Sequence, residues 1–392
     1  MAYMIKVLVT HNETFHCDEV CAVALLKLLY GDIRVIRTRD FSQIQELASQ
    51  GAYVIDVGQE YNHDQRRYDH HQKTFNDTWK GVSKEKPQIN RQQGGKASIL
   101  LSSFGLVYRH YGLDLIQQLT SDETPLVSHQ INPESTLQSC MNAKTFENFY
   151  YHFVQHLDAH DNGVSQVPEG TVVNYTRVVT LPSIISSFNS HNVQNHELQY
   201  EQFMRAVDLA STIIHESLLG EIRKTVEFTQ NTPIVDQALQ EAREQKREWI
   251  VLPQSINWGP VLKTLDPLAT IKLIILPRGN QGQYQVSTRR IPGQGFKAYL
   301  DLITPDEAKR LVGDENLIFL HRARFIGVTR NLESAQRIAV ASLRVMNSWQ
   351  TRVSRIWTRG SQWVKRNRTP LIGGAQLVLG SWLYWKFSRS RV

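Results

Sequence analysis

The feature that most constrains the fold of this chain is an alternation of apolar strand-like runs and helical runs over its first 60 residues. In order, these runs are IKVLVT, CAVALLKLL, IRVIRT, IQELA and AYVIDVG. Such alternation is typical of an α/β fold with a mainly parallel sheet. Ligands bind at the carboxyl ends of the strands in sheets of this kind. We therefore expect a site near His11, the loop from Arg37 to Asp40, and Asp56, which follow or end the three strands.

The remainder of the chain indicates a second α/β region. Residues 72–95 are polar and predict a long surface loop, and helical runs include 196–227 and 234–246. Beyond Trp249, the segments WIVL, IKLIIL, YQVSTR and LIFLHRARF predict strands, with a helix near 305–311. We predict an N-terminal domain over residues 1–180, a helical connection with a smaller C-terminal α/β domain over 181–340, and a tail over 341–392.

The net charge of +7 belongs to the tail. The last acidic residue is Glu333, and residues 341–392 contain ten Lys and Arg and no Asp or Glu. The rest of the chain has 34 basic and 37 acidic residues, a net charge of −3. Overall basicity therefore gives little support to nucleic-acid binding by the body, which would need local arginines and bound metal to attract phosphate.

Cysteine usage and the N-terminus bear on the compartment. Cys17, Cys21 and Cys140 are too few and too oddly spaced for a disulfide framework, which predicts a reducing compartment. The strand-like MIKVLVT begins within three residues of Met1, so no secretory or transit signal is visible. We expect an intracellular protein of the cytoplasm, nucleus or mitochondrion, and not a secreted one.

Histidine and aspartate residues recur where strands end or helices begin. They are His11, His16 and Asp18 in THNETFHCDE, Asp56 in VIDVG, Asp69, His70 and His71 in RRYDHHQ, and Asp158 and Asp161 in LDAHDNG. Imidazole and carboxylate groups suit Mn²⁺, Fe²⁺ or Zn²⁺, and a bridging carboxylate holds two metals close together. Two such metals support phosphoryl displacement. Each residue alone also has a structural alternative, such as Asp18 capping the helix that follows it.

These motifs carry a resemblance to a known family. The triplet Asp69-His70-His71, preceded by Asp56 and a His-x4-His-x-Asp cluster, resembles the DHH phosphoesterase superfamily. More narrowly, THNETFHCDE, IRTRD, VIDVG, RYDHHQ, LDAHDNG and ARFIG are similar in order to the melanocyte-proliferating-gene family, whose members resemble 3′-to-5′ exoribonucleases. The similarity covers about residues 5 to 340.

The resemblance implies roles for single residues. The metal ligands would be His11, His16, Asp18, Asp56, His70 and Asp158, with Asp161 as an alternative to Asp158 that the sequence leaves open. Asp69, His70 and His71 would form the catalytic triplet, with His71 facing the substrate phosphate as hydrogen-bond donor or general acid. The C-terminal domain would close over the substrate.

Four arginines are candidates for substrate binding. Arg37 and Arg39 lie after the second strand and could bind phosphate, although an ion pair of this loop with Asp40 is the alternative. Arg289 and Arg290 could contact a nucleic-acid backbone, or could be ordinary surface charge.

Some residues depart from the family pattern or invite other interpretations. Glu13 and Val328 stand where the family has glycine, which could alter the loop at His11 and the C-terminal domain. Cys17 could be a zinc ligand or nucleophile, but with Cys21 one helical turn later it also fits a packing role.

The tail combines a basic amphipathic stretch with an apolar one. Residues 340–364 place Leu343 and Met346 on one helical side and arginines on another. Residues 369–385 have no charge over 17 positions and end in aromatic residues. We hypothesise a membrane anchor or interfacial helix at residues 341–392, resembling tail anchors of the mitochondrial outer membrane. The alternatives are a nucleic-acid-contacting tail and a helix that packs on the domain.

Taken together, the sequence predicts a metal-dependent phosphodiesterase. The preferred function is a 3′-to-5′ exonuclease that acts on RNA or single-stranded DNA with two Mn²⁺ or Mg²⁺ ions. One alternative is a small-molecule phosphohydrolase, such as a pyrophosphatase or a nano-oligonucleotide hydrolase. The other is a non-catalytic metal-binding scaffold protein.

Overall fold

The structure is a computed structural model that describes residues 5–82, 99–121, 136–167, 170–172, 178–190, 195–279, 282–289 and 301–347. The chain forms two compact units, Met1–Thr229 and Gln230–Val392. The division falls inside α7 (His196–Glu244), not at residue 180 where the sequence suggested a boundary. The expected helices at 196–227 and 234–246 are one helix, since buried apolar positions such as Val235 and Leu239 continue the helical spacing past Pro233.

The first unit contains a five-stranded sheet in the order β2-β1-β3-β5-β4. Strands β2, β1, β3 and β5 pair in parallel, and only β4 is antiparallel. Three parallel strands end beside one another at one edge, which is the arrangement that the first 60 residues predict. The bounds are β1 (Lys6–Thr10), β2 (Ile33–Arg37), β3 (Tyr53–Ile55), β4 (Tyr61–Asn62) and β5 (Arg67–Tyr68).

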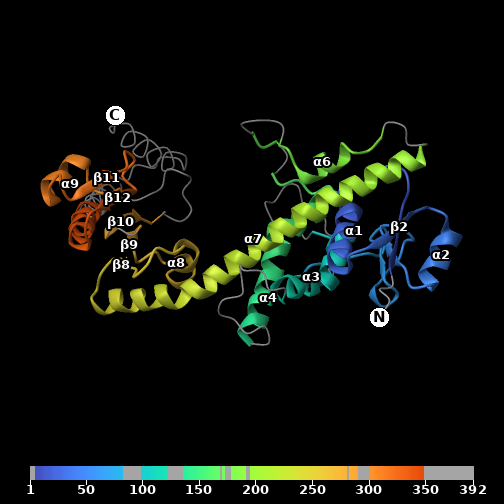
Figure 1. Cartoon of the computed structure of the whole chain (residues 1–392), viewed down its shortest axis with the longest axis horizontal. Helices are drawn as coiled ribbons and strands as arrows, with labels where there is room; N and C mark the ends of the chain where they lie inside the picture. The colour runs from blue at the N-terminus through green and yellow to red at the C-terminus, as the bar shows by residue number, and fades with distance from the viewer. Residues whose placement is uncertain are drawn as a thin grey trace, which may run out of the picture. The chain divides into compact units, whose positions relative to one another are not determined.

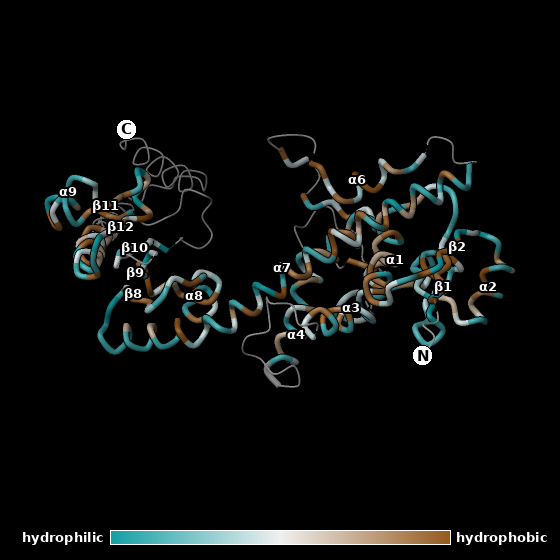
Figure 2. Tube along the Cα trace, in the orientation of Figure 1, coloured by the Kyte–Doolittle hydropathy of each residue, from teal (hydrophilic) through white to brown (hydrophobic). Residues whose placement is uncertain are grey.

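Both faces of this sheet are covered by helices (Figure 1). Leu8 and Ile55 pack into the large core with α1 (Cys17–Tyr30), whereas Val9 and Val54 pack on the other face against Ile44 of α2 (Phe41–Ser49). Successive strand residues point to opposite faces, so an all-apolar strand is buried on both. Figure 2 shows α1 as mostly hydrophobic, in keeping with its burial between the sheet and α3.

The remaining elements of this unit follow the sheet in the sequence, except η1, which lies between β4 and β5. Part of the expected loop at 72–95 is a short hairpin, tied down by Arg109, which donates to Asp77 at 2.7 Å. Residues 83–98 of that loop lie outside the described residues. The bounds are η1 (His63–Gln65), β6 (Asp77–Thr78), β7 (Gly81–Val82), α3 (Ser103–Ser121), α4 (Thr136–Phe149), the π-helix η2 (Tyr150–Val154), α5 (Gln155–Asp161) and α6 (Leu181–Ser186).

The second unit is a five-stranded sheet with helices, in the order β11-β12-β10-β9-β8. The mixed α/β class predicted from the sequence is confirmed in both units. The expected strand LIFLHRARF divides into β11 and a turn that leads to β12, since Arg324 adopts a left-handed φ of 55°. The bounds are β8 (Trp249–Val251), α8 (Gly259–Leu265), β9 (Leu273–Arg278), β10 (Gln283–Thr288), α9 (Pro305–Val312), β11 (Leu317–Leu320) and β12 (Ile326–Thr329).

The first part of the expected tail packs on this second sheet. Residues 332–347 are helical, and Leu343 and Met346 are buried with Trp249. Of the three hypotheses for the tail, domain packing describes these residues. Residues 348–392 lie outside the described residues, and none of the helices that the structure describes has a stretch long and apolar enough to cross a membrane.

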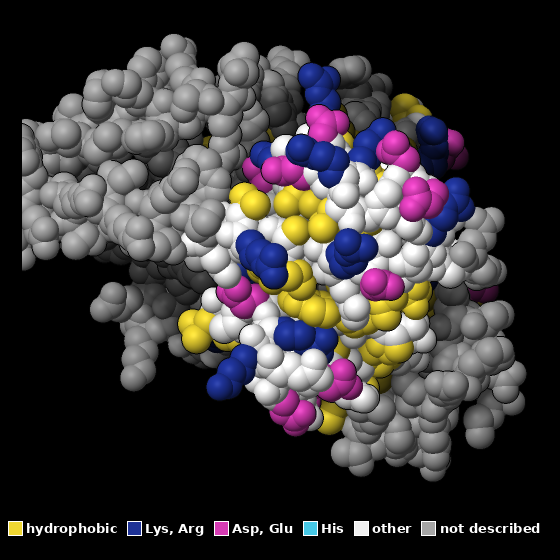
Figure 3. All heavy atoms as spheres, turned by 90° about the vertical axis from the view of Figure 1, so that its left-hand side faces the viewer, with side chains coloured by type: hydrophobic (Ala, Val, Ile, Leu, Met, Phe, Trp, Pro, Cys, Tyr) yellow, Lys and Arg dark blue, Asp and Glu magenta, His cyan; other side chains and the backbone are white. Residues whose placement is uncertain are grey.

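The surface of the second unit that faces the viewer in Figure 3 has hydrophobic side chains exposed among charged ones.

Arg289 is part of the interior of the second unit. Its guanidinium pairs with the Asp266 carboxylate and donates to the Asp266 carbonyl at 2.6 Å. Both residues are buried, and Asp266 also accepts hydrogen bonds from the backbone of Thr270 and Ile271. The expected role of Arg289 in substrate binding does not fit this placement, because its donors are used inside the unit. Arg290 lies outside the described residues.

Replacing Asp266 by Asn should destabilise the second unit by about 3 kcal/mol, because it leaves a buried guanidinium without its partner. Burial opposes ionisation of Asp266, but hydrogen bonds from Ile271 and Thr270 and the charge of Arg289 hold its pKa below the usual value. The difference from wild type should therefore persist at neutral pH and shrink only in acid, as the wild-type carboxylate becomes protonated. Urea denaturation of both proteins at several pH values measures this difference in the free energy of unfolding.

The matched control is Asp314→Asn, which removes an exposed ion pair with Lys309. Asp314→Asn should lower the free energy of unfolding by less than about 1 kcal/mol. Equal effects of the two substitutions would contradict a structural role for the Arg289–Asp266 pair.

Candidate metal centre

The carboxyl ends of three neighbouring parallel strands supply most of the site. His11 follows β1, Asp56 follows β3, and the Asp69-His70-His71 triplet follows β5. The first turn of α1 adds His16, Asp18 and Glu19, and Asp161 comes from the end of α5. Residues far apart in the sequence meet here because parallel strands end at the same edge of a sheet.

Asp56 lies between two sets of side chains. Its Oδ2 is 3.4 Å from Nε2 of His11, and its Oδ1 is 3.4 Å from Nε2 of His70. Ser103 donates a hydrogen bond of 2.9 Å to Oδ1. Asp56 adopts a left-handed φ of 57°, a conformation that costs free energy in a residue other than glycine and concentrates at functional sites. The backbone thus turns the carboxylate toward both histidines.

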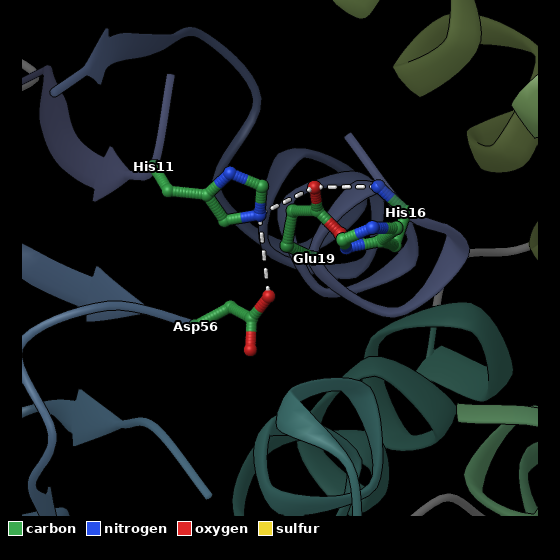
Figure 4. Close-up of side chains that lie close together, drawn as sticks. All are labelled: His11, His16, Glu19 and Asp56. Atoms are coloured by element: carbon green, nitrogen blue, oxygen red, sulfur yellow. Dashed lines mark hydrogen bonds and ion pairs between the residues drawn. The ribbon is translucent and has the colours of Figure 1, made fainter. Parts of the chain in front are cut away.

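The first set is His11, His16, Glu19 and Asp56, whose ligand atoms all lie within 4.8 Å of one another (Figure 4). His11 Nε2 is 3.1 Å from Glu19 Oε1. Burial lowers the pKa of His11, but hydrogen bonds to Asp56 and Glu19 outweigh burial and raise that pKa to about 10. The carboxylates of Asp56 and Glu19 therefore stabilise the positively charged form of His11.

The second set surrounds His70. Its Nε2 lies 3.3 Å from Asp161 Oδ2 and 3.8 Å from Asp18 Oδ2. His70, Asp18 and Asp161 form one group of ligand type, and His70 also groups with Asp56 and His71. Asp56 thus belongs to both sets, one through each carboxylate oxygen.

The chemistry of these donors fits divalent cations. Both carboxylate oxygens of Asp18 and Oε2 of Glu19 are buried without a hydrogen-bond partner in the part of the chain that is described. Burial and the nearby Asp56 charge raise the pKa of Asp18 well above its usual value. Buried carboxylates without partners are costly, and bound cations are what offsets that cost in proteins.

Asp158 and Asp161 occupy different places. Asp161 reaches His70, whereas Asp158 is fully buried and accepts hydrogen bonds from the Ser102 backbone N–H at 3.0 Å and the Ser102 hydroxyl at 2.7 Å. A Cβ at Gly105 would lie 2.4 Å from Asp158 Oδ1, so α3 begins directly against this carboxylate. Burial raises the pKa of Asp158 to about 7 despite the Ser102 hydrogen bonds. Asp161 therefore lies in the ligand-type group around His70, whereas Asp158 lies against the start of α3.

Asp69 orients His71 instead of joining the ligand sets. Its Oδ1 accepts from the His71 backbone N–H at 3.0 Å and is 2.8 Å from His71 Nδ1. Its Oδ2 accepts from the Gln59 backbone at 2.6 Å. The hydrogen bond to Asp69 raises the pKa of His71 to about 8, and the His71 side chain is 58% exposed. His71 therefore stands at the solvent side of the centre, held by a buried carboxylate.

Arg37 and Arg39 differ in their surroundings. Arg37 donates to the carbonyls of His11 and Glu13 and lies over the ring of Phe203, so it fixes the loop that carries His11. This placement does not fit the expected contact of Arg37 with substrate. Arg39 is exposed, and its Nη2 lies 3.1 Å from His11 Nδ1.

The departures from the family pattern have local consequences. Glu13 adopts a φ of 68°, a left-handed conformation that glycine adopts without strain. Val328 is buried in β12 and pairs with Gln285 of β10. Cys17 and Cys21 are buried thiols with sulfurs 3.7 Å apart, and the hydrogen bond to Cys21, together with burial, raises the pKa of Cys17. A protonated buried thiol fits the packing interpretation of Cys17.

Three residues that the structure places at this site were not predicted from the sequence: Glu19, Ser102 and Ser103. Glu19 stands three residues after His16, the usual spacing of a helix capping residue, which conceals any other role. Ser102 and Ser103 lie at a helix start, where serine is common. Only the fold brings them to Asp158 and Asp56.

The chain is similar in sequence to a family of known proteins. The model of the MYG1 exonuclease family, described as the uncharacterised protein family UPF0160, matches residues 7–343. The chain is 33% identical to the MYG1 exonuclease of Bos taurus over 356 residues, which cover 85% of this chain and 84% of that protein. It is 33% identical to the MYG1 exonuclease of Homo sapiens, with 85% of each chain covered, and 28% identical to the MYG1 protein YER156C of Saccharomyces cerevisiae, with 87% and 96% covered.

A solved structure of the pGpG-specific phosphodiesterase PggH from Vibrio cholerae aligns with 88% of this chain and 99% of that chain, at 13% identity and a TM-score of 0.26. The family model spans most of the chain, and the mammalian relatives exceed 30% identity over most of their length. The chain belongs to the MYG1 exonuclease family.

Proposed function

We propose that this protein is a metal-dependent phosphodiesterase that removes nucleotides from the 3′ end of RNA or single-stranded DNA. The observation that carries the proposal is the shared carboxylate of Asp56, which lies between two sets of ligand-type side chains, and these sets include buried carboxylate oxygens without partners. The names of the mammalian relatives, MYG1 exonuclease, supply the class of substrate.

Two ion positions follow from the two sets. His11, His16 and Asp56 would hold one divalent ion, and Asp18, His70, Asp161 and Asp56 the other. Two bound Mn²⁺ or Mg²⁺ ions would lower the pKa of an attacking water and neutralise charge that develops on the phosphate. Mixed imidazole and carboxylate ligands suit Mn²⁺ somewhat better than Mg²⁺, which prefers oxygen ligands.

His71 can act on the leaving oxygen of the substrate. Asp69 engages Nδ1, which leaves Nε2 as the atom that can hold a proton for transfer. A general acid must reach its target within hydrogen-bond distance, and the exposure of His71 at the site allows that approach. Asp69 fixes the ring, so its part in catalysis is one of positioning.

Arg39 can bind the substrate phosphate. When His11 coordinates through Nε2, its Nδ1 carries a proton and donates to the Asn12 carbonyl, 3.0 Å away. Nδ1 then cannot accept from Arg39, and the exposed guanidinium is free to form charge-assisted hydrogen bonds with a phosphate.

The first test concerns the ligands. Asp56→Asn and His70→Ala should each lower hydrolysis of a labelled oligonucleotide by at least about 100-fold, because each removes a ligand and not only an outer contact. The control is His160→Ala, an exposed histidine on α5 next to Asp161. Undiminished hydrolysis by both ligand variants would place the chemistry elsewhere.

The second test concerns substrate and metal. Full-length protein should shorten 20-mers of RNA or single-stranded DNA from the 3′ end, visible as a ladder of 5′-labelled products. Chelator should abolish the activity, and added Mn²⁺ or Mg²⁺ should restore it. Turnover of pyrophosphate or dinucleotides alone would instead identify a small-molecule phosphohydrolase. Metal binding without turnover of any of these substrates would identify a scaffold.

The third test separates the two arginines of the β2 loop. Arg39→Ala should raise KM for the oligonucleotide roughly tenfold and change kcat little, as expected for loss of a ground-state phosphate contact. Arg37→Ala should lower thermal stability, since it removes the hydrogen bonds that fix the His11 loop. An unchanged KM for Arg39→Ala would exclude its proposed contact.

A further inference from the structure

We infer that Glu19 is a metal ligand, and that it completes the position formed by His11, His16 and Asp56. The inference rests on the proposed function, since it concerns the same centre, and it adds a carboxylate that the family motifs do not point to. Figure 4 shows these four side chains turned toward one another at the start of α1.

The first turn of α1 fixes the position of Glu19. Its Oε1 accepts a hydrogen bond of 2.7 Å from the His16 backbone N–H. The same oxygen lies 3.1 Å from His11 Nε2. The side chain is fully buried, so its orientation is set by these contacts and not by solvent. A ligand held in place before binding loses little conformational entropy when an ion arrives.

Around Glu19, the hydrogen-bond donors are too few for the buried acceptor atoms. Glu19 Oε2 is buried and has no hydrogen-bond partner among the described residues. His11 Nε2 can carry one proton, yet it faces both Glu19 Oε1 and Asp56 Oδ2. One N–H cannot satisfy two buried carboxylates. A divalent cation satisfies both, because it binds several oxygen and nitrogen lone pairs at once.

The charge of the two positions supports the same conclusion. Without Glu19, the first position has two neutral imidazoles and a carboxylate that it shares, whereas the second has Asp18 and Asp161 of its own. The N-terminus of α1 also carries a partial positive charge, which disfavours a nearby cation. Glu19 offsets this helix charge and gives the first position a carboxylate of its own.

Glu19 also has an ordinary structural role that the experiment must separate. A glutamate at this place in a helix accepts a hydrogen bond from the capping residue, and glutamine does the same. Glu19→Gln therefore keeps the cap and removes the charge. The second unit offers a matched control in Glu307, which accepts a 2.9 Å hydrogen bond from the Thr304 backbone at the start of α9 and is exposed.

The experiment is a Mn²⁺ titration of full-length protein, after removal of metal with chelator, by calorimetry and by the electron paramagnetic resonance of free Mn²⁺. Wild type and Glu307→Gln should bind two ions. In Glu19→Gln, one of the two ions should bind about 10- to 100-fold more weakly. The rise in melting temperature on adding Mn²⁺ should be smaller in Glu19→Gln than in wild type, while the chelated proteins melt alike.

The outcomes are distinct. Two ions bound by Glu19→Gln with wild-type affinity would overturn the inference and leave the proposed function intact. No Mn²⁺ binding by wild type would overturn the proposed function itself. If chelated Glu19→Gln melts at a lower temperature than wild type, the loss of Mn²⁺ affinity could reflect lost stability. The Glu19→Asp variant then separates coordination from stability, because it restores the negative charge. Tighter binding by Asp than by Gln supports coordination, and equal binding by the two contradicts it.

Discussion

The carboxylate of Asp56 joins the two sets of ligand-type side chains. Its oxygens lie 3.4 Å from His11 on one side and 3.4 Å from His70 on the other. The left-handed backbone at the end of β3 makes this possible, and the burial of β3 on both faces of the sheet holds the strained residue in place. Hydrogen bonds to His11 and His70 overcome the effect of burial and keep the pKa of Asp56 below its usual value. Asp56 is therefore ionised between the two histidines.

A network of buried polar contacts at the start of α3 fixes the position of Asp56. Ser103 donates to Asp56, and the neighbouring Ser102 donates to Asp158, so the start of α3 lies between the two carboxylates. Gly105 leaves no room for a side chain at this contact. Asp158 and Asp56 therefore both contact the start of α3. Buried polar networks of this kind fix one geometry, because each unmade hydrogen bond is costly.

Three features of the sequence each allow two interpretations that only packing separates. The acidic first turn of α1 has the pattern of a helix cap, but the fold buries Glu19 beside His11. Arg289 has the pattern of a surface contact for nucleic acid, but it is buried against Asp266. In the tail, apolar spacing that suits a membrane surface equally suits a protein core, and Leu343 and Met346 pack in the core. Periodicity shows that a face is apolar and does not show what covers it.

The sequence by itself determined the parallel α/β class, the strand ends at which chemistry gathers, and the motifs that contain His11, Asp56 and His70. These follow from local patterns: apolar runs of strand and helix length, and polar residues placed where the runs stop. The sequence did not determine the division within α7, the choice between Asp158 and Asp161, or the place of Glu19. Those depend on which side chains meet across the fold: Asp161 lies beside His70, whereas Asp158 accepts hydrogen bonds from Ser102. Tertiary structure decided them, since distance along a chain does not specify distance in space.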